Sequence, residues 1–313
     1  MELIRGKNNL RSRHRPTAVT IGNFDGVHRG HQAILRQLRE LADANDLLAT
    51  VMAFEPMPRE FFAPDSAPAR LSRLREKLQA LRDHGADQFF CLPFNAQVAG
   101  MAPETFVGEL LVNGLGARHV IVGDDFRFGA KRSGDYAMLK RLGDEAGFSV
   151  TPMATVEVDG ERVSSTAVRA ALAAGNMDKA CRLLGRRYSM TGHVTYGNAL
   201  GRTLGFPTAN IRPGRHVTPL SGIFAVWAHG IGDEALPAVA SVGTRPTVAG
   251  SDALLEVHVF DFSGDLYGRL LRVEFVEYLR PEEKFPDLET MRVQMLDDAA
   301  SARRILAARP AKL

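Results

Sequence analysis

Short apolar runs alternate with amphipathic segments along the first part of the chain. The apolar run at 18–21 is followed by residues 31–44, where Leu, Ile and Ala recur at helical spacing, and then by another apolar run at 47–54. Apolar runs of this length are typical of strands buried on both faces, whereas apolar positions three and four apart predict an amphipathic helix. This order of elements predicts a β-α-β unit.

The same alternation continues to residue 184. Further strands are predicted at 89–92, 120–123 and 148–158, and helices at 71–83, 103–112, 167–174 and 177–184. The segment 55–68 is so rich in proline that we expect no regular structure there. Helices that alternate with strands predict a parallel sheet covered on both faces and joined by right-handed crossovers.

Beyond Gly185 the pattern changes. Strands are predicted, without helices between them, at 188–194, 222–229, 236–242, 254–260 and 270–278. One amphipathic helix at 288–307 closes the chain. Short strands at this spacing are typical of an antiparallel barrel or sandwich. The sequence therefore predicts an α/β domain over residues 1–184 and an all-β domain over residues 185–313.

Composition and charge are those of an ordinary globular protein. Of the 313 residues, 45% are hydrophobic and 24% are charged, so two domain cores can be filled. The net charge of +3 suits a protein that handles polyphosphates. Because there is no long Lys/Arg block, we expect no nucleic-acid partner, and the Arg-rich start at 11–15 is interpreted as a solvated segment.

The cysteines and the hydropathy of the chain indicate the cellular compartment that we expect. The two cysteines, Cys91 and Cys181, have no CxxC spacing, so neither a disulfide framework nor a zinc site is indicated. The N-terminus lacks the apolar core of a signal peptide, and no run approaches the ~20 apolar residues of a membrane span. We therefore expect a cytoplasmic protein that contacts no membrane.

A glycine-rich turn separates the first apolar run from the helix that follows. The residues of this turn are Gly22, Asn23, Phe24, Asp25 and Gly26. His28 and His31 stand three apart at the helix start, so both imidazoles can donate to one polyphosphate beside the free backbone N–H groups. Two alternatives stay open. One is a metal site, although HExxH is absent and no third ligand is evident nearby, and the other is a pair of solvated histidines.

Two further loops follow predicted elements in a way that suits the same polyphosphate. Asp125 and Arg127 lie in the loop after the strand at 120–123, where α/β proteins bind ligands. Three hydroxyls and a cation surround a later helix start: Ser164, Ser165, Thr166 and Arg169. An ordinary helix N-cap is the alternative for these hydroxyls. Together the three segments can surround one polyphosphate with hydroxyls, imidazoles, guanidinium and backbone amides.

The second domain has a glycine-rich segment at 192–210 that allows close approach of backbone to phosphate. Thr208 and Asn210, two apart in an extended segment, point to the same side and can hold Mg²⁺ through neutral oxygens. In the strand at 254–260, Glu256 lies opposite the apolar face and can act as a base. A glycine-rich hairpin with a polar edge and a solvated carboxylate are the alternatives.

Three first-domain motifs, GNFDGVHRGHQ, GDDFRFG and VSSTAVR, resemble the FAD synthetase family, and HRGH resembles the HxGH signature of nucleotidyltransferases. The resemblance implies a Rossmann-like domain in which the FMN phosphate attacks the α-phosphorus of ATP, with Mg²⁺, giving FAD and pyrophosphate. It implies catalytic roles for His28, His31 and Arg169, and ATP binding by 22–26 and 164–166. The implied flavin-binding residues are Phe54, Pro56, Pro58, Phe62, Asp125, Arg127 and Phe128. Met57 stands where the family often has His, so no catalytic role is assigned to it.

The second-domain motifs, GFPTAN, SVGTRPT, LEVHVFDF and DLYGRLLRVEF, resemble riboflavin kinases. The resemblance implies a β-barrel in which Glu256 takes the ribityl hydroxyl proton of riboflavin as that hydroxyl attacks the γ-phosphorus of ATP. It implies Thr208 and Asn210 as metal ligands. The implied ATP-binding residues are Gly201, Arg202, Gly205 and Thr208. In this order, the two sets of motifs resemble the bifunctional riboflavin kinase and FAD synthetase enzymes of prokaryotes.

Two other functions stay open from the residues alone. One is a nucleotidyltransferase for another phosphate acceptor, with the β domain as a binding module. The other is a flavin-binding regulator without turnover. The partners that we expect are the small molecules riboflavin, FMN and ATP, with flavoprotein clients for the product, and the sequence leaves the oligomeric state open.

Overall fold

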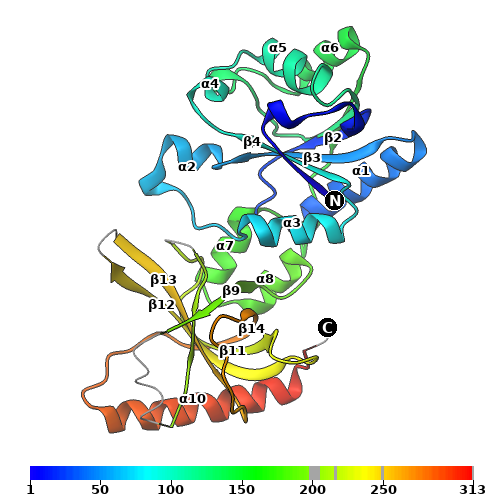
Figure 1. Cartoon of the computed structure of the whole chain (residues 1–313). Coiled ribbons are helices and arrows are strands. Elements are labelled where there is room, and N and C mark those ends of the chain that lie inside the picture. The colour runs from blue at the N-terminus through cyan, green and yellow to red at the C-terminus, as the bar shows by residue number, and fades with distance from the viewer. Residues whose placement is uncertain (197–204, 215–216, 248–249, 312–313) are drawn as a thin grey trace. The chain divides into compact units, whose positions relative to one another are not determined.

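The computed structural model describes residues 1–196, 205–214, 217–247 and 250–311 (Figure 1). Two compact units make up the chain. The first comprises Met1–Ala67 and Arg73–Val163, and the second comprises Pro68–Ser72 and Ser164–Leu313. Each unit has its own sheet and its own buried core.

Six parallel strands form the sheet of the first unit. In spatial order they are β1 (Glu2–Arg5), β4 (Gln88–Pro93), β3 (Leu48–Glu55), β2 (Thr17–Ile21), β5 (Ala117–Gly123) and β6 (Ser149–Met153). The predicted parallel sheet is confirmed. The sequence pattern missed β1 because it has four residues, of which only Ile4 is buried.

Helices cover both faces of this sheet because the strands are apolar on both sides. Ala18 and Val51 are buried on one face, and Val19 and Met52 on the other, as expected for neighbours along a strand. The helices on the first face are α1 (Arg29–Ala44) and α3 (Leu74–Asp83). Those on the second are α5 (Pro103–Phe106), a π-helical continuation at Val107–Val112, and α6 (Tyr136–Ala146).

Two expectations about short elements of this unit were wrong. The proline-rich segment forms α2 (Pro58–Phe62) and a 3-10 turn at Pro64–Ser66. Pro58 suits a first helical position, where no N–H partner is needed, and the Glu60 carboxylate accepts from the Met57 N–H at 2.9 Å. The strand expected at 148–158 ends at Met153. The remaining short elements are α4 (Ala96–Ala99), β7 (Glu157–Val158) and β8 (Glu161–Arg162), with 3-10 turns at Lys7–Asn9, Ser12–His14 and Ala130–Arg132.

The Arg-rich start is only partly solvated. Its arginines are exposed as expected, but His14 is buried and its Nε2 lies 3.1 Å from Oε1 of Glu2. Arg13 donates to the same oxygen at 2.7 Å. The guanidinium of Arg13, followed by the imidazole of His14, holds the pKa of Glu2 below its usual value. These contacts join the Arg-rich segment at 11–15 to Glu2 of β1.

Six antiparallel strands of the second unit close into a barrel, which decides between the barrel and the sandwich. In spatial order they are β10 (Ala209–Arg212), β13 (Gly250–Val259), β12 (Leu236–Thr247), β11 (Gly222–His229), β14 (Leu270–Arg280) and β9 (Ser189–Thr195). Phe224, Val226, Leu255 and Val257 are fully buried. The short strand β10 was predicted only as an extended segment, and it closes the barrel between β9 and β13.

Within the described residues, three helices belong to the same unit as the barrel. The long helix α10 (Leu288–Ala308) packs through Ala299, Ala302 and Leu306 against Ala225 and Val276 of the barrel. Two shorter helices precede the barrel, α7 (Ser165–Ala173) and α8 (Met177–Leu184). None of the helices in the described ranges combines the length and hydropathy that crossing a membrane requires.

Candidate active sites

The turn between β2 and α1 takes its shape from its own buried side chains. Phe24 and Val27 adopt φ angles of 47° and 42°, which residues with large side chains rarely do. Both are buried in the core with Leu35 of α1. A Cβ on Gly22 would lie 3.1 Å from the Phe24 ring. The core thus holds a strained turn in one conformation, which is a frequent feature of functional sites.

His28 and His31 are brought together at the start of α1. His28 is the N-cap, and its Nδ1 accepts from the His31 backbone N–H at 3.4 Å. The two rings stack with their centroids 3.7 Å apart and their planes 19° from parallel. Because Nδ1 accepts, the proton of the neutral His28 ring lies on Nε2, which is then a hydrogen-bond donor.

Gly30 makes room for the His28 ring. A Cβ at this position would lie 3.2 Å from Cε1 and Nδ1 of His28. Such a contact is tight enough to push the imidazole away from the helix start. The need for space beside the His28 ring therefore explains why a glycine stands at this position of the HRGH motif.

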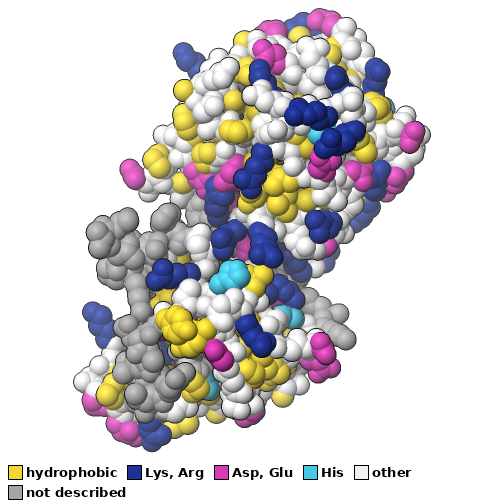
Figure 2. Space-filling model, in the orientation of Figure 1, with side chains coloured by type: hydrophobic (Ala, Val, Ile, Leu, Met, Phe, Trp, Pro, Cys, Tyr) yellow, Lys and Arg dark blue, Asp and Glu magenta, His cyan; other side chains and the backbone are white. Residues whose placement is uncertain are grey.

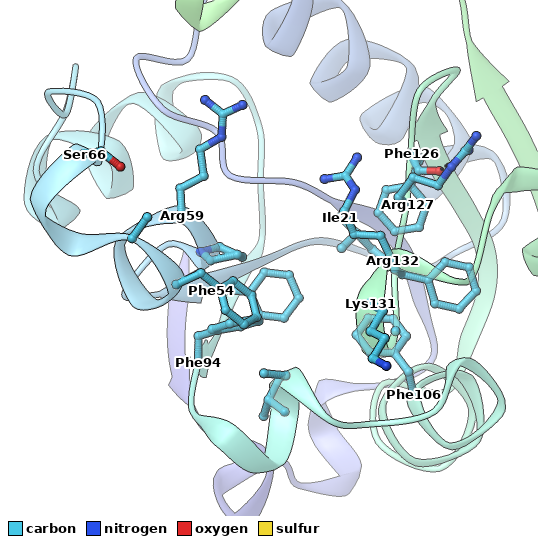
Figure 3. Close-up of a pocket in the computed structure, with 17 residues that line it drawn as sticks. Ile21, Phe54, Arg59, Ser66, Phe94, Phe106, Phe126, Arg127, Lys131 and Arg132 are labelled. Carbon is cyan, nitrogen blue, oxygen red and sulfur yellow. Dashed lines mark hydrogen bonds between the residues drawn. The ribbon is translucent and has the colours of Figure 1, made fainter.

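A cavity of about 510 Å³ lies at the carboxyl edge of the N-terminal sheet (Figure 3). One of its lining residues is Ile21, the last residue of β2. Five of the seven residues implied for flavin binding line this cavity: Phe54, Pro58, Phe62, Arg127 and Phe128. The other two, Pro56 and Asp125, are not among the lining residues. Asp125 instead pairs with Arg162, whose guanidinium nitrogen lies 2.9 Å from Oδ2.

Sequence reasoning missed much of this cavity. The lining residues to which it assigned no role include Arg59, Phe94, Phe106, Phe126, Lys131 and Arg132. Phe94 follows β4 directly, so its place at the carboxyl end of a strand was an available signal. Phe106 carried no such signal, because it reads as an ordinary core residue of α5. The cavity is therefore more aromatic and more cationic than expected.

Ser164, Ser165, Thr166 and Arg169 belong to the second compact unit. Ser164 is the N-cap of α7, and its Oγ accepts from the Ala167 N–H at 3.1 Å. Arg169 donates from Nε to the carbonyl oxygen of Ala69 at 2.6 Å. The N-cap alternative for Ser164 is therefore present in the structure. Its Oγ and the Nε of Arg169 each have a structural partner.

The barrel brings Asn210 and Glu256 together. They are direct partners in the register between β10 and β13, so their side chains lie on the same face. Thr195 lies next to Asn210 on β9, and Ser241 lies next to Glu256 on β12. These four residues define the polar row, which crosses four strands. The neighbours of Glu256 along β13, Leu255 and Val257, are buried, as the predicted apolar face requires.

The donors around Asn210 fit a hard divalent cation. Asn210 is 7% exposed, and its buried Oδ1 has no hydrogen-bond partner among the described residues. Thr208, two residues earlier, is half-buried, and its segment is fixed by His258, whose Nδ1 lies 2.9 Å from the Pro207 carbonyl oxygen. Mg²⁺ prefers oxygen ligands and few protein groups, with phosphates supplying the others. An unpartnered amide oxygen, with a carboxylate opposite it in the register and a threonine two residues before it, suits that preference.

Two of the implied nucleotide-binding residues, Gly201 and Arg202, lie outside the described residues. Gly205 is described and has a φ of 81°, a conformation that glycine adopts without strain. At the other end of the polar row, Ser241 donates to Oε1 of Glu282 at 2.9 Å. A Cβ on Gly243 would lie 2.5 Å from this carboxylate, so the glycine there leaves space for Glu282. Glu282 is a further acidic residue beside the polar row, and the sequence had assigned it no role.

A parallel sheet with a histidine-capped turn and a barrel with a polar row together suit a two-domain enzyme of phosphate transfer. Residues 10–167 match the family model for FAD synthetase, and residues 184–306 match the model for riboflavin kinase. The chain belongs to the family of bifunctional riboflavin kinase/FMN adenylyltransferases.

Two relatives that match this chain over almost its whole length are named for both activities. The chain is 49% identical to a bifunctional riboflavin kinase/FMN adenylyltransferase of Pseudomonas fluorescens over 98% of both chains. It is 47% identical to the protein of the same name from Escherichia coli K12 over 97% of both. A solved structure from Streptococcus pneumoniae, described as a macrolide-efflux protein, is 28% identical, with a TM-score of 0.82, over 97% of this chain and 99% of its own. The fold is thus shared along the whole chain.

Proposed function

We propose that this enzyme makes FAD from riboflavin in two ATP-dependent steps. Its riboflavin kinase domain transfers the γ-phosphoryl group of ATP to riboflavin, giving FMN and ADP. Its adenylyltransferase domain transfers the adenylyl group of a second ATP to the phosphate of FMN, giving FAD and pyrophosphate. The observation that carries the proposal is the presence of both family domains, in this order, in one chain.

In the adenylyltransferase domain, the chemistry needs positioning and positive charge rather than a covalent intermediate. The Nε2–H of His28 and the ring of His31 stacked on it are the donors that we assign to the phosphates of ATP. The turn at 22–26 supplies backbone N–H groups to the same phosphates. The aromatic cavity of about 510 Å³ takes the flavin ring.

In the kinase domain, Glu256 is the base for the ribityl hydroxyl. Its partner in the register, Asn210, and the nearby Thr208 would hold Mg²⁺ through their oxygens. The bound cation would offset the charge of the ATP phosphates. Glu256 would then accept the hydroxyl proton as the oxygen attacks. We assign residues 1–184 to adenylylation and residues 185–313 to phosphorylation.

The test is to incubate the full chain with riboflavin, ATP and Mg²⁺ and to follow FMN and FAD by chromatography. We expect FMN to form first and FAD to follow, with one ADP and one pyrophosphate released for each FAD. Omission of Mg²⁺ should abolish both products. Formation of FMN without FAD would contradict the assignment of the first domain, and adenylylation of added FMN without phosphorylation of riboflavin would contradict that of the second.

A further inference from the structure

The cavity of the first unit is lined by cations and aromatic rings and by no carboxylate among the described residues. Its cations are Arg59, Arg127, Lys131 and Arg132. In Figure 3, Lys131 and Arg132 project from one wall and Arg59 from the opposite wall. A cavity with this lining favours a ligand that has both a flat apolar part and a negative charge.

Lys131 and Arg132 differ from the other cation of their loop. Arg127 donates to the Phe126 carbonyl oxygen at 3.1 Å. By contrast, within the described part of the chain, neither the Lys131 ammonium nor the Arg132 guanidinium has a hydrogen bond or an ion pair. Both side chains are exposed at the cavity, so they remain available to an incoming anion without first losing a protein partner.

The backbone holds these two residues in an unusual conformation. Lys131 has φ 54° and ψ 23°, and Arg132 has φ 59°, the left-handed region that favours glycine. The loop is fixed on both sides, because Ala130 donates to the Met101 carbonyl oxygen at 2.8 Å and Phe128 and Gly134 exchange backbone hydrogen bonds. Two consecutive charged residues held in this way indicate a functional constraint on the direction of their side chains.

The position of the cavity relates this charge to the reaction. Ile21 lines it and directly precedes the turn that leads to His28 and His31. A flavin seated among the aromatic rings would therefore have its side chain near the place assigned to the phosphates of ATP. A phosphate at the end of that side chain is the group that must be held there before it attacks.

We propose that Lys131 and Arg132 select the phosphorylated flavin in the adenylylation cavity by contacting its phosphate. The proposal rests on the adenylyltransferase function proposed above. FMN carries a phosphate with nearly two negative charges at neutral pH, whereas riboflavin ends in a neutral hydroxyl. Charge-assisted hydrogen bonds to two cations favour FMN, and the product of the kinase step thus displaces its substrate from this cavity.

The test compares FMN with 5′-deoxyriboflavin in the full-length enzyme. This analogue keeps the flavin ring but has neither a phosphate nor a hydroxyl that the kinase can use. In Lys131→Gln/Arg132→Gln we expect the KM for FMN in FAD synthesis to rise about 10- to 100-fold. The inhibition constant of 5′-deoxyriboflavin against FMN should change less than about threefold, because its contacts are with the aromatic rings.

Two further variants control the result. Lys140→Gln/Arg141→Gln removes the same two charges from α6, where they pair with Asp144 and Glu145, and should leave the KM for FMN unchanged. Lys131→Arg/Arg132→Lys keeps both charges and should retain most of the affinity. Riboflavin phosphorylation by the same chain reports that each variant is folded.

Three results would overturn the proposal. They are an unchanged KM for FMN in the double variant, an equal loss of affinity for FMN and 5′-deoxyriboflavin, and a rise confined to the KM for ATP. The last would assign the two cations to the nucleotide instead. Failure of the proposed function itself would be separate, because the unsubstituted enzyme would then form no FAD from FMN and ATP.

Discussion

The two candidate sites differ in the charge of the side chains that they bring together. At the edge of the N-terminal sheet, the turn is followed by two stacked imidazoles. Ile21, which precedes this turn, lines a cavity that has four cations and no carboxylate among the described residues. On the barrel, the polar row of Thr195, Asn210, Glu256 and Ser241 contains neutral oxygens and a carboxylate, and none of its four members is a cation.

The difference follows from the two nucleophiles. The FMN phosphate is already an anion at neutral pH, so its attack needs positive charge and alignment but no base. The ribityl hydroxyl is neutral, so its attack requires a group that accepts the proton. On the barrel, we assign this role to Glu256, which lies beside the oxygen of Asn210 that we propose as a Mg²⁺ ligand. In the function that we propose, each site thus supplies what its own nucleophile lacks.

The sharpest test of this contrast is Glu256→Gln, which keeps the shape of the side chain but removes the proton acceptor. We expect riboflavin phosphorylation to fall by ~10²- to 10⁴-fold, the usual contribution of a general base. Adenylylation of added FMN should be unchanged, and it serves as the folding control. A variant that phosphorylates riboflavin at the normal rate would return Glu256 to the role of a solvated surface carboxylate.

The reciprocal change is His31→Ala. It removes a donor that we assign to the phosphates of ATP in the first domain, and loss of such a contact costs ~10²- to 10³-fold in rate. Steady-state assays should show that FMN accumulates from riboflavin while FAD synthesis falls. If kinase activity fell as far, the two sites would not be independent and the contrast between them would be lost.

The sequence pattern predicted most of the fold because both kinds of sheet leave a clear signal. Parallel strands such as β3 are apolar on both faces, and barrel strands such as β13 alternate around Glu256. Elements that leave little signal were missed or misjudged. The strand β1 has one buried residue, and β10 has only four residues. In α2, Pro58 stands at the first helical position after a capping box, so a proline that usually indicates a loop begins a helix.

The site was less predictable than the fold. Motifs identified His28, His31, Asn210 and Glu256, and the structure places the first two together and the last two together. Of the cations that line the cavity, Arg127 was named from its motif, whereas Lys131 and Arg132 carried no signal of their own. The direction of Lys131 and Arg132 depends on left-handed φ angles, which a sequence without glycine at those positions does not indicate.

A smaller effect is expected from Gly30→Ala, which tests the geometry of the histidine pair without removing either ring. The new Cβ would lie 3.2 Å from the His28 ring and displace it. Misplacement of this kind should lower FAD synthesis by roughly tenfold, less than the ~10²-fold attributed to a 1 Å error. Gly108→Ala is the matched control, because nothing lies within 4 Å of a Cβ there. Equal activity of both variants would show that the stacked arrangement is unimportant.

The smallest effect concerns where the kinase domain begins. We proposed residues 185–313, yet α7 and α8 lie in the same compact unit as the barrel. Gly175, between these helices, packs closely against the ring of Tyr278 of β14. Arg309 follows α10, and its Nη1 lies 2.9 Å from Oδ1 of Asp178 in α8 and 2.9 Å from Oε2 of Glu277 in β14.

We therefore expect fragments 164–313 and 185–313 both to fold and to phosphorylate riboflavin at similar rates, since Thr208, Asn210 and Glu256 lie in each. The shorter fragment leaves Tyr278 uncovered and Arg309 without Asp178, and it should be less stable by ~1–3 kcal/mol, mostly from lost apolar burial, since exposed ion pairs contribute little. Urea denaturation of the two fragments measures the difference, and kinase assays give the rates. A shorter fragment that is unfolded, or folded and inactive, would mean that α7 and α8 are part of the kinase domain, and the boundary would move from residue 185 to residue 164.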